Sequence, residues 1–397
     1  MAIDDPHLTH GALATNEDPD AVDQEEDVSG GGEGKPWDAS KIRITTKNFT
    51  LREISTQIKD EEIDLAPDFQ RAFVWKARQR TRLVESILLG IPLPAFYFNQ
   101  EKDGAYQVVD GVQRLTTAHR FMEGHHTLAK EDLEYLKHLD GQNYAGLDVL
   151  LRRRFAATQI VVHVIEPQTP DELKYDIFSR VNTLGSPLSA QEIRHAMSKP
   201  RARDFLRDLV ALPSFDAATG RVFWRRGPDG FLVREDHRMM DRELALRFCA
   251  FCVTPLPRYG AFESLDAFLL EMTRSLDGRP SALEPIGDDE LAALRVKFDR
   301  AMQNAAEILG PTAFRRVVVG QGRRGPLNRA LFEAQALALV DHQLATLAPR
   351  KQEVQEALHR LIAEPEYLGA VTQATGDRHR VWLRLESTRE AVLRALA

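Results

Sequence analysis

The first half of the chain alternates between two spacings of apolar residues, one typical of strands and one typical of helices. Short aromatic and β-branched runs predict strands at 42–44, 61–65, 95–99, 106–109 and 158–165. Apolar residues three and four positions apart predict helices at 51–58, 76–89, 113–123, 147–155 and from 169 to about 181. The run at 158–165 is almost wholly apolar, so we expect it inside its sheet. Residues 41–200 are therefore predicted to form one domain of strands and helices.

The second half of the chain is almost entirely helical in pattern. Apolar spacing predicts helices at 202–212, 236–253, 261–276, 288–309, 328–347 and 351–363. Stretches rich in Gly and Pro predict loops at 227–230, 255–257 and 320–326. The run 381–385 fits either a last strand or part of a helix. Residues 201–397 are therefore predicted to form a mainly α-helical domain.

Negative charge is concentrated at the start of the chain. The formal net charge is −7. Residues 1–35 hold one Lys and ten Asp or Glu, which gives −9 there and leaves +2 for the rest. An acidic, Gly-rich stretch with few aromatics predicts that residues 1–36 are disordered, as a solvated leader or alternatively an interaction tail. The nearly neutral remainder gives no overall signal for nucleic acid or for an acidic partner.

The sequence gives no sign of a membrane or secreted protein. No apolar run approaches a membrane span, and the N-terminus lacks a basic region followed by an apolar one, so we expect a cytoplasmic protein. The two cysteines, Cys249 and Cys252, lie in an apolar helical pattern without a second pair, which favours core packing over zinc or redox chemistry. The histidines lack metal-ligand spacing with carboxylates, so nothing indicates zinc or an organic cofactor.

The stretch 105–122 carries the clearest candidate chemistry. A strand ending near Asp110 runs through Gly111 into a helix. The first turn of a helix has unpaired backbone N–H groups that favour an anion, and Arg114 adds a fork of donors suited to phosphate. Asp110 can cap the helix, hold a metal ion or position a water. The alternative is structural, with Asp110 only capping and Arg114 only pairing with it.

Two other segments carry polar side chains in well-anchored loops. Gln70 and Arg71 lie among three aromatic residues, so their loop must pack against the domain. Arg180 and Asn182 lie where one predicted helix ends and the next, starting with a capping box at Ser189, begins. If these segments meet the turn at Asp110, arginines from three blocks form one phosphate clamp.

Four blocks of this sequence resemble the bacterial family found as the N-terminal domain of GmrSD-type modification-dependent restriction enzymes. The blocks are Phe-Gln-Arg at 69–71 with Trp75, Glu-Ser-Ile-Leu-Leu-Gly-Ile-Pro-Leu-Pro at 85–94, Asp-Gly-Val-Gln-Arg-Leu at 110–115, and Phe-x-Arg-x-Asn-x-x-Gly-x-x-Leu-x-x-x-Glu at 178–192. The match covers roughly residues 45–200. The family is similar in fold to the ParB/sulfiredoxin group, so the resemblance implies an α+β domain with a small mixed sheet, followed by the mainly helical region.

The resemblance also implies what the turn does. In the family, an Asp-Gly-Gln-Gln-Arg motif is associated with NTP hydrolysis or nuclease function. This chain keeps Asp110, Gly111, Gln113 and Arg114, but the first Gln of the motif is Val112, which cannot donate a hydrogen bond. Phosphate binding is therefore expected, and turnover is in question. No His-rich nuclease motif follows residue 200, so DNA cleavage would need the first domain or a partner protein.

The favoured function is a nucleotide-binding protein, an NTPase of a restriction-like or anti-phage defence system. Its partners would be a nucleoside triphosphate with Mg²⁺ at Asp110, and also DNA and a separate nuclease or defence protein. One alternative is a DNA nuclease at the same site, and another is a non-catalytic DNA-binding module using basic pairs such as Arg225-Arg226. The expected catalytic residues are Asp110, Gln113 and Arg114, and the expected phosphate-binding residues are Gln70, Arg71, Gly111, Arg180 and Asn182.

Overall fold

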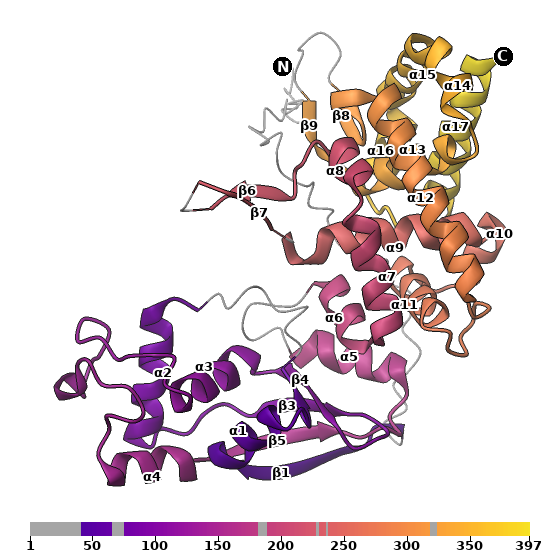
Figure 1. The fold of residues 1–397 in the computed structure, drawn as a ribbon. Coiled ribbons are helices and arrows are strands. Elements are labelled where there is room, and N and C mark those ends of the chain that lie inside the picture. Colours follow the sequence, from indigo (N-terminus) through magenta and orange to yellow (C-terminus); the bar gives the residue numbers. More distant parts are fainter. Residues whose placement is uncertain (1–40, 66–74, 182–188, 228–229, 236, 318–323) are drawn as a thin grey trace, which may run out of the picture.

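The structure is a computed structural model, and it describes residues 41–65, 75–181, 189–227, 230–235, 237–317 and 324–397. A sheet-based domain holds the first part of this chain, and a larger helical domain holds the rest (Figure 1). The predicted leader at 1–36 lies outside the described residues.

One mixed sheet organises the first domain. Its strands are β1 (Ile44–Thr50), β2 (Ile63–Asp64), β3 (Phe96–Gln100), β4 (Tyr106–Asp110) and β5 (Gln159–Ile165). They lie in the order β1-β5-β3-β4-β2. The β1–β5 and β3–β4 pairs are antiparallel, whereas β3–β5 and β2–β4 are parallel. The predicted α+β class with a small mixed sheet is confirmed, and β5 lies inside the sheet as its apolar sequence predicts.

Helices cover both faces of this sheet. They are α1 (Leu51–Lys59), α2 (Ala77–Leu89), α3 (Val112–Met122), α4 (Val149–Ala157), α5 (Asp171–Val181) and α6 (Ala190–Met197), with the short 3₁₀ helix η2 (Lys137–Leu139). Helices α1 to α4 pack in one apolar cluster with Val108, whereas α5 and α6 pack in another with Val109. Consecutive residues of a strand point to opposite faces, so the two clusters lie on opposite sides of β4 (Figure 1).

Two helix ends in this domain show how local residues set the bounds of the helices. Thr50 and Glu53 form a capping box at the start of α1, in which each side chain accepts a hydrogen bond from the other residue's backbone N–H. Gly90 ends α2 in the left-handed conformation, with φ at 78°.

The second domain is helical with two short hairpins. Its helices are α7 (Pro200–Val210), α8 (Pro213–Thr219), α9 (Met240–Val253), α10 (Leu256–Tyr259), α11 (Leu265–Leu276), α12 (Asp288–Ile308), α13 (Arg329–Val340), α14 (Leu344–Leu347), α15 (Lys351–Ala363), α16 (Pro365–Thr372) and α17 (Arg378–Leu396), with the 3₁₀ helices η4 (His237–Met239), η5 (Gly310–Thr312) and η6 (Ala348–Arg350). The hairpins are β6 (Trp224–Arg226) with β7 (Leu232–Arg234), and β8 (Arg315–Val317) with β9 (Arg324–Leu327). The ambiguous run at 381–385 is part of α17. Among the described helices, none is both long and apolar enough to cross a membrane.

A buried group of charged side chains joins α9 and α13 of this domain to α6 of the first domain. Glu243 on α9 pairs with Arg247 at 2.8 Å, with Arg329 on α13 at 3.2 Å and with Arg194 on α6 at 3.4 Å. Burial alone would raise the pKa of Glu243, but the three arginines hold it at about 2. The carboxylate therefore stays ionised and stabilises three buried cations.

The two cysteines pack in the helical core, as their sequence context predicts. Cys249 is fully buried on α9, and Cys252 packs against the same apolar cluster. Burial raises the pKa of both thiols, which disfavours the reactive thiolate.

Candidate functional site

The turn between β4 and α3 depends on a glycine at one position. β4 ends at Asp110, Gly111 adopts φ of 98°, and α3 begins at Val112. A Cβ atom on Gly111 would lie 2.2 Å from Cδ1 of Phe96, the first residue of β3, whose side chain is 1% exposed. Only glycine satisfies both the positive φ and the close approach to this ring. The turn is therefore held in one shape by the aromatic ring beneath it.

Arg114 is bound on several sides within the domain. Its Nη2 donates to Oδ2 of Asp110 at 2.7 Å and to the carbonyl of Ala95 at 3.2 Å, and its Nη1 donates to the carbonyl of Pro94. The guanidinium also lies 4.2 Å from the centroid of the Phe96 ring. Its side chain is only 14% exposed, and burial lowers the pKa of Arg114 although Asp110 counteracts this. Arg114 thus fixes the turn to the segment before β3.

Asp110 remains accessible while Arg114 holds it. Its side chain is 33% exposed, and the ion pair with Arg114 engages Oδ2. Its other oxygen, Oδ1, has no hydrogen-bond partner within the described ranges. The arrangement therefore leaves one carboxylate oxygen, in a fixed orientation, at the N-terminus of an 11-residue helix whose first residue has no side-chain cap.

The donor set at the turn suits Mg²⁺ shared with a phosphate. The described part of the chain contains no group of three or more His, Cys, Asp or Glu side chains that could hold a metal. Mg²⁺ commonly binds through one or two carboxylates together with substrate phosphates and waters. A single oriented carboxylate such as Asp110 fits that mode, whereas it would not form a site made by protein ligands alone.

Val112, the departure from the family motif, is a core residue. Its side chain is 4% exposed and belongs to the apolar cluster under α1 to α4. The polar contact that the motif's Gln was expected to supply is replaced by packing. Gln113 is half-buried beside it.

The structure tests the predicted clamp only in part. Gln70, Arg71 and Asn182 lie outside the described residues. Arg180 is exposed in the last turn of α5. This helix packs on β4, and its Phe178 belongs to the same buried cluster as Val109, the neighbour of Asp110. The end of α5 and the end of β4 therefore lie together, but the convergence of three arginines stays a prediction.

Sequence reasoning missed the parts of the second block that shape this site. In the sequence, the block at 85–94 is noted only as part of the family resemblance. The structure shows that the carbonyls of Pro94 and Ala95 bind Arg114 and that Phe96 supports Gly111. One sequence signal could have indicated this contact. The block at 85–94 is part of the same family resemblance as the Asp-Gly motif, although helix and strand periodicity do not account for its proline residues.

The other end of that block anchors a loop. Glu85 on α2 is 3% exposed, and its carboxylate accepts hydrogen bonds from the backbone N–H groups of Glu134, Tyr135 and Leu136 at 2.7 to 3.0 Å. Burial would raise the pKa of Glu85, but these bonds outweigh it and hold the pKa below its ordinary value. Glu85 is therefore a structural residue of the domain.

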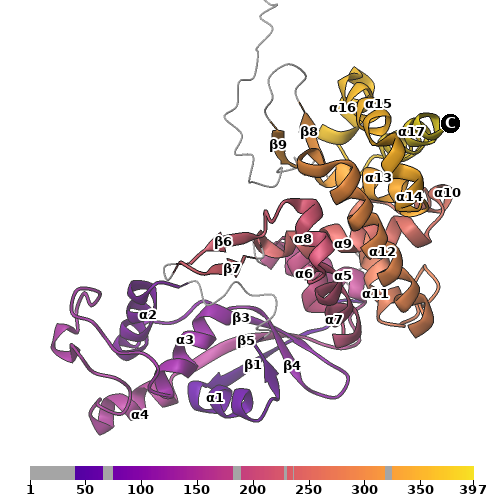
Figure 2. The same ribbon diagram turned by 45° about the horizontal axis from the view of Figure 1, so that its top comes forward.

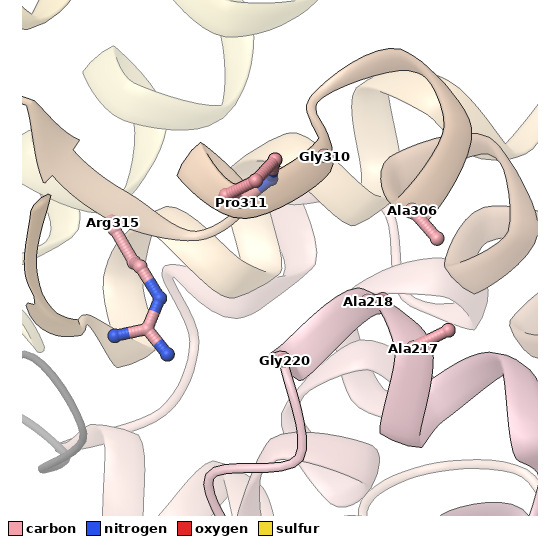
Figure 3. Close-up of a pocket in the computed structure, with 7 residues that line it drawn as sticks. All are labelled: Ala217, Ala218, Gly220, Ala306, Gly310, Pro311 and Arg315. Atoms are coloured by element: carbon pink, nitrogen blue, oxygen red, sulfur yellow. The ribbon is translucent and has the colours of Figure 1, made fainter.

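A pocket of about 270 Å³ lies elsewhere, in the helical domain. It is bounded by α8, the end of α12 and η5, and small residues line it together with the buried Arg315 (Figure 3). Arg315 donates to the carbonyls of Thr219 and Gly325, so its guanidinium supports the pocket wall. None of the predicted site residues lines this pocket.

Comparison with known proteins shows a similarity in the first part of the chain. Residues 51–198 match the family model described as the GmrSD restriction endonuclease, N-terminal domain. No curated protein matches the chain. Among solved structures, a Pnob8-like ParB-N domain in its C2221 form matches with 11% identity over 90% of this chain and 99% of that chain, at a TM-score of 0.22. That TM-score is too low for the likeness to carry an argument. Residues 51–198 are therefore similar to GmrSD restriction endonuclease N-terminal domains.

Proposed function

We propose that the Asp110–Arg114 turn binds the phosphates of a nucleoside triphosphate with Mg²⁺, and that the chain is an NTPase module of a restriction system directed at foreign DNA. The proposal rests on the carboxylate of Asp110, which Arg114 orients through Oδ2. Its other oxygen lies at the start of α3, which has no side-chain cap. The family match supports a module of a restriction system.

Each residue has a defined part in this proposal. Asp110 would hold Mg²⁺, which when bound would neutralise phosphate charge. The N-terminus of α3 would attract the phosphate through its backbone N–H groups. Arg114 acts as a positioning residue, because its donors already bind Asp110 and two carbonyls. The exposed Arg180, together with Arg71, is then the better candidate for contacting phosphate oxygens directly.

Calorimetric titration with ATP and with GTP, each in the presence of Mg²⁺, tests the site. Asp110→Asn keeps an oxygen that Arg114 can bind but removes the charge, so we expect at least about a tenfold weaker nucleotide affinity. Arg180→Ala removes an exposed cation and should weaken binding by a similar factor. Arg153→Ala, an exposed arginine on α4, is the control and should bind as the unmodified protein does.

The outcomes separate the candidate activities. Nucleotide affinity unchanged by both Asp110→Asn and Arg180→Ala would refute the phosphate site. Release of inorganic phosphate that is lost in Asp110→Asn would establish the NTPase. Mg²⁺-dependent nicking of plasmid DNA that is lost in the same variant, without nucleotide turnover, would support the nuclease alternative instead.

A further inference from the structure

The β6–β7 hairpin projects from the helical domain on a fixed base. In both views it extends beyond the helices that carry it (Figures 1 and 2). At its base, Arg234 pairs with Asp216 at 3.2 Å and with Asp241 at 3.3 Å. The backbone N–H of Glu235 also bonds the carbonyl of the fully buried Phe223 at 2.8 Å. The orientation of the hairpin is therefore set by the domain core.

Both faces of this hairpin are exposed, and each combines a cation with an apolar side chain. Leu232 is 51% exposed and lies opposite the exposed Arg226. Val233 is 53% exposed and lies opposite Arg225, whose side chain is 66% exposed and forms an ion pair through Nε with the exposed carboxylate of Glu235. Because side chains alternate along a strand, the two pairs lie on opposite faces. Leu232 and Val233 follow Phe231, which is 73% exposed, so three consecutive apolar residues are exposed on this hairpin, and contiguous exposed apolar surface is typical of interaction sites.

We infer that the hairpin inserts into the major groove of duplex DNA. The major groove is about 12 Å wide and admits a two-stranded ribbon. A groove covers both faces of the ribbon at once, whereas a protein partner docked on one face would leave the other pair exposed. Arg225 and Arg226, on opposite faces, would then meet the phosphates of the two strands, while the apolar side chains contact base edges.

This role is separate from nucleotide binding. The hairpin belongs to the helical domain, whereas Asp110 belongs to the sheet domain. The Asp110→Asn variant should therefore bind duplex DNA as the unmodified chain does, even if it no longer binds nucleotide. A loss of DNA binding confined to hairpin variants, without a change in nucleotide affinity, distinguishes the two sites.

Fluorescence anisotropy with a labelled, unmodified duplex tests the hairpin in the full chain without nucleotide. Each phosphate contact contributes about 0.9 to the slope of log affinity against log salt. The double variant Arg225→Ala/Arg226→Ala should flatten that slope by about 1.8 and weaken binding at least about tenfold near 0.1 M salt. The control Arg153→Ala/Arg389→Ala loses two exposed arginines from α4 and α17 and should keep the original slope.

A second variant tests the apolar contacts. Leu232→Ser/Val233→Ser should weaken duplex binding without changing the salt slope, because no charge is lost. If the double arginine variant does not fold, Arg226→Gln alone should flatten the slope by about 0.9. The inference is overturned if the full chain does not bind duplex DNA. It is also overturned if the hairpin variants bind like the control pair, as they would if the hairpin docked on a protein.

Discussion

Substitution of Glu85 measures how much its buried carboxylate stabilises the loop at 134–136 in the first domain. Its buried carboxylate accepts backbone hydrogen bonds at both oxygens, from Tyr135 and Leu136 at 2.7 Å and from Glu134 at 3.0 Å. Glu85→Gln keeps the shape of the side chain, but it removes the charge and puts an NH₂ group where one oxygen accepted. We expect the loop at 134–136 to open more often.

The size of the effect follows from these bonds. A hydrogen bond to a charged group contributes about 1.5 to 3 kcal/mol net, and a neutral one about 1 kcal/mol. All three N–H groups can still bond an amide oxygen in the position of Oε1, but these bonds become bonds to a neutral acceptor, and the N–H of Glu134 also loses its second acceptor, Oε2. We therefore expect a loss of about 2 kcal/mol, equivalent to about a 30-fold increase in the opening constant of the loop.

Hydrogen–deuterium exchange measured on peptides covering 129–140 reports that opening directly. Glu134→Gln is the matched control, because Glu134 lies in the same loop but its side chain pairs with Arg82 at the surface. It should change exchange little, since exposed ion pairs contribute about 0 to 1 kcal/mol. Equal exchange rates in the two variants would refute the role assigned to Glu85.

The pH dependence gives an independent check on the same group. The pKa of Glu85 is lowered in the folded domain, so its stabilisation is complete above the ordinary value of 4.5 and is lost as pH falls through the folded pKa. The difference in protection between the unmodified protein and Glu85→Gln should therefore be constant near neutral pH and shrink below 4.5. A difference that grows on acidification would contradict this sign.

Three further substitutions have expected outcomes in urea unfolding. Gly111→Ala should cost about 2 kcal/mol or more, because the added Cβ would clash with the ring of Phe96 and the backbone would be strained by its positive φ. Gly104→Ala is its control: φ is 96° and the surrounding space is open, so only the backbone strain should destabilise the protein. Glu243→Gln should cost about 3 to 5 kcal/mol by removing a buried carboxylate shared by three buried arginines, whereas Glu390→Gln at an exposed pair should be nearly neutral. Thr50→Ala should cost about 1 kcal/mol through loss of the capping box, and no shift in the unfolding midpoint would count against that cap.

Long apolar runs and capping residues made most of the first domain predictable. The strand at 159–165 and the capping box at Thr50 follow from local patterns, and the structure has both. Pairing partners were not predictable from such patterns, because the sheet order depends on contacts between residues far apart in sequence. In the helical domain, the strands at 224–226, 232–234, 315–317 and 324–327 were predicted as loops or left without structure. These strands of three or four residues are too short to show a two-residue periodicity.

The candidate site shows a similar limit. Asp110, Gly111 and Arg114 were found because a strand, a glycine turn and a helix follow one another in the sequence. The hydrogen bonds from Arg114 to the carbonyls of Pro94 and Ala95 could not be predicted, because every residue has a backbone carbonyl and the sequence does not mark which of them accepts a bond. The sequence therefore located the turn and left open whether Arg114 takes part in catalysis or only pairs with Asp110; the structure has the pair with Asp110 and adds the bonds to two carbonyls.

The order of the sheet has a consequence for how the protein is made. β1 pairs with β5, about 110 to 120 residues later in the chain, and β3 also relies on β5 as a neighbour. During synthesis the ribosome releases β1, β3 and the Asp110 turn long before β5 is available. Phe96, which supports Gly111, lies on β3 and acquires its parallel neighbour only when residues 159–165 have emerged. The newly made turn therefore reaches its final shape late, after the whole sheet domain has left the exit tunnel.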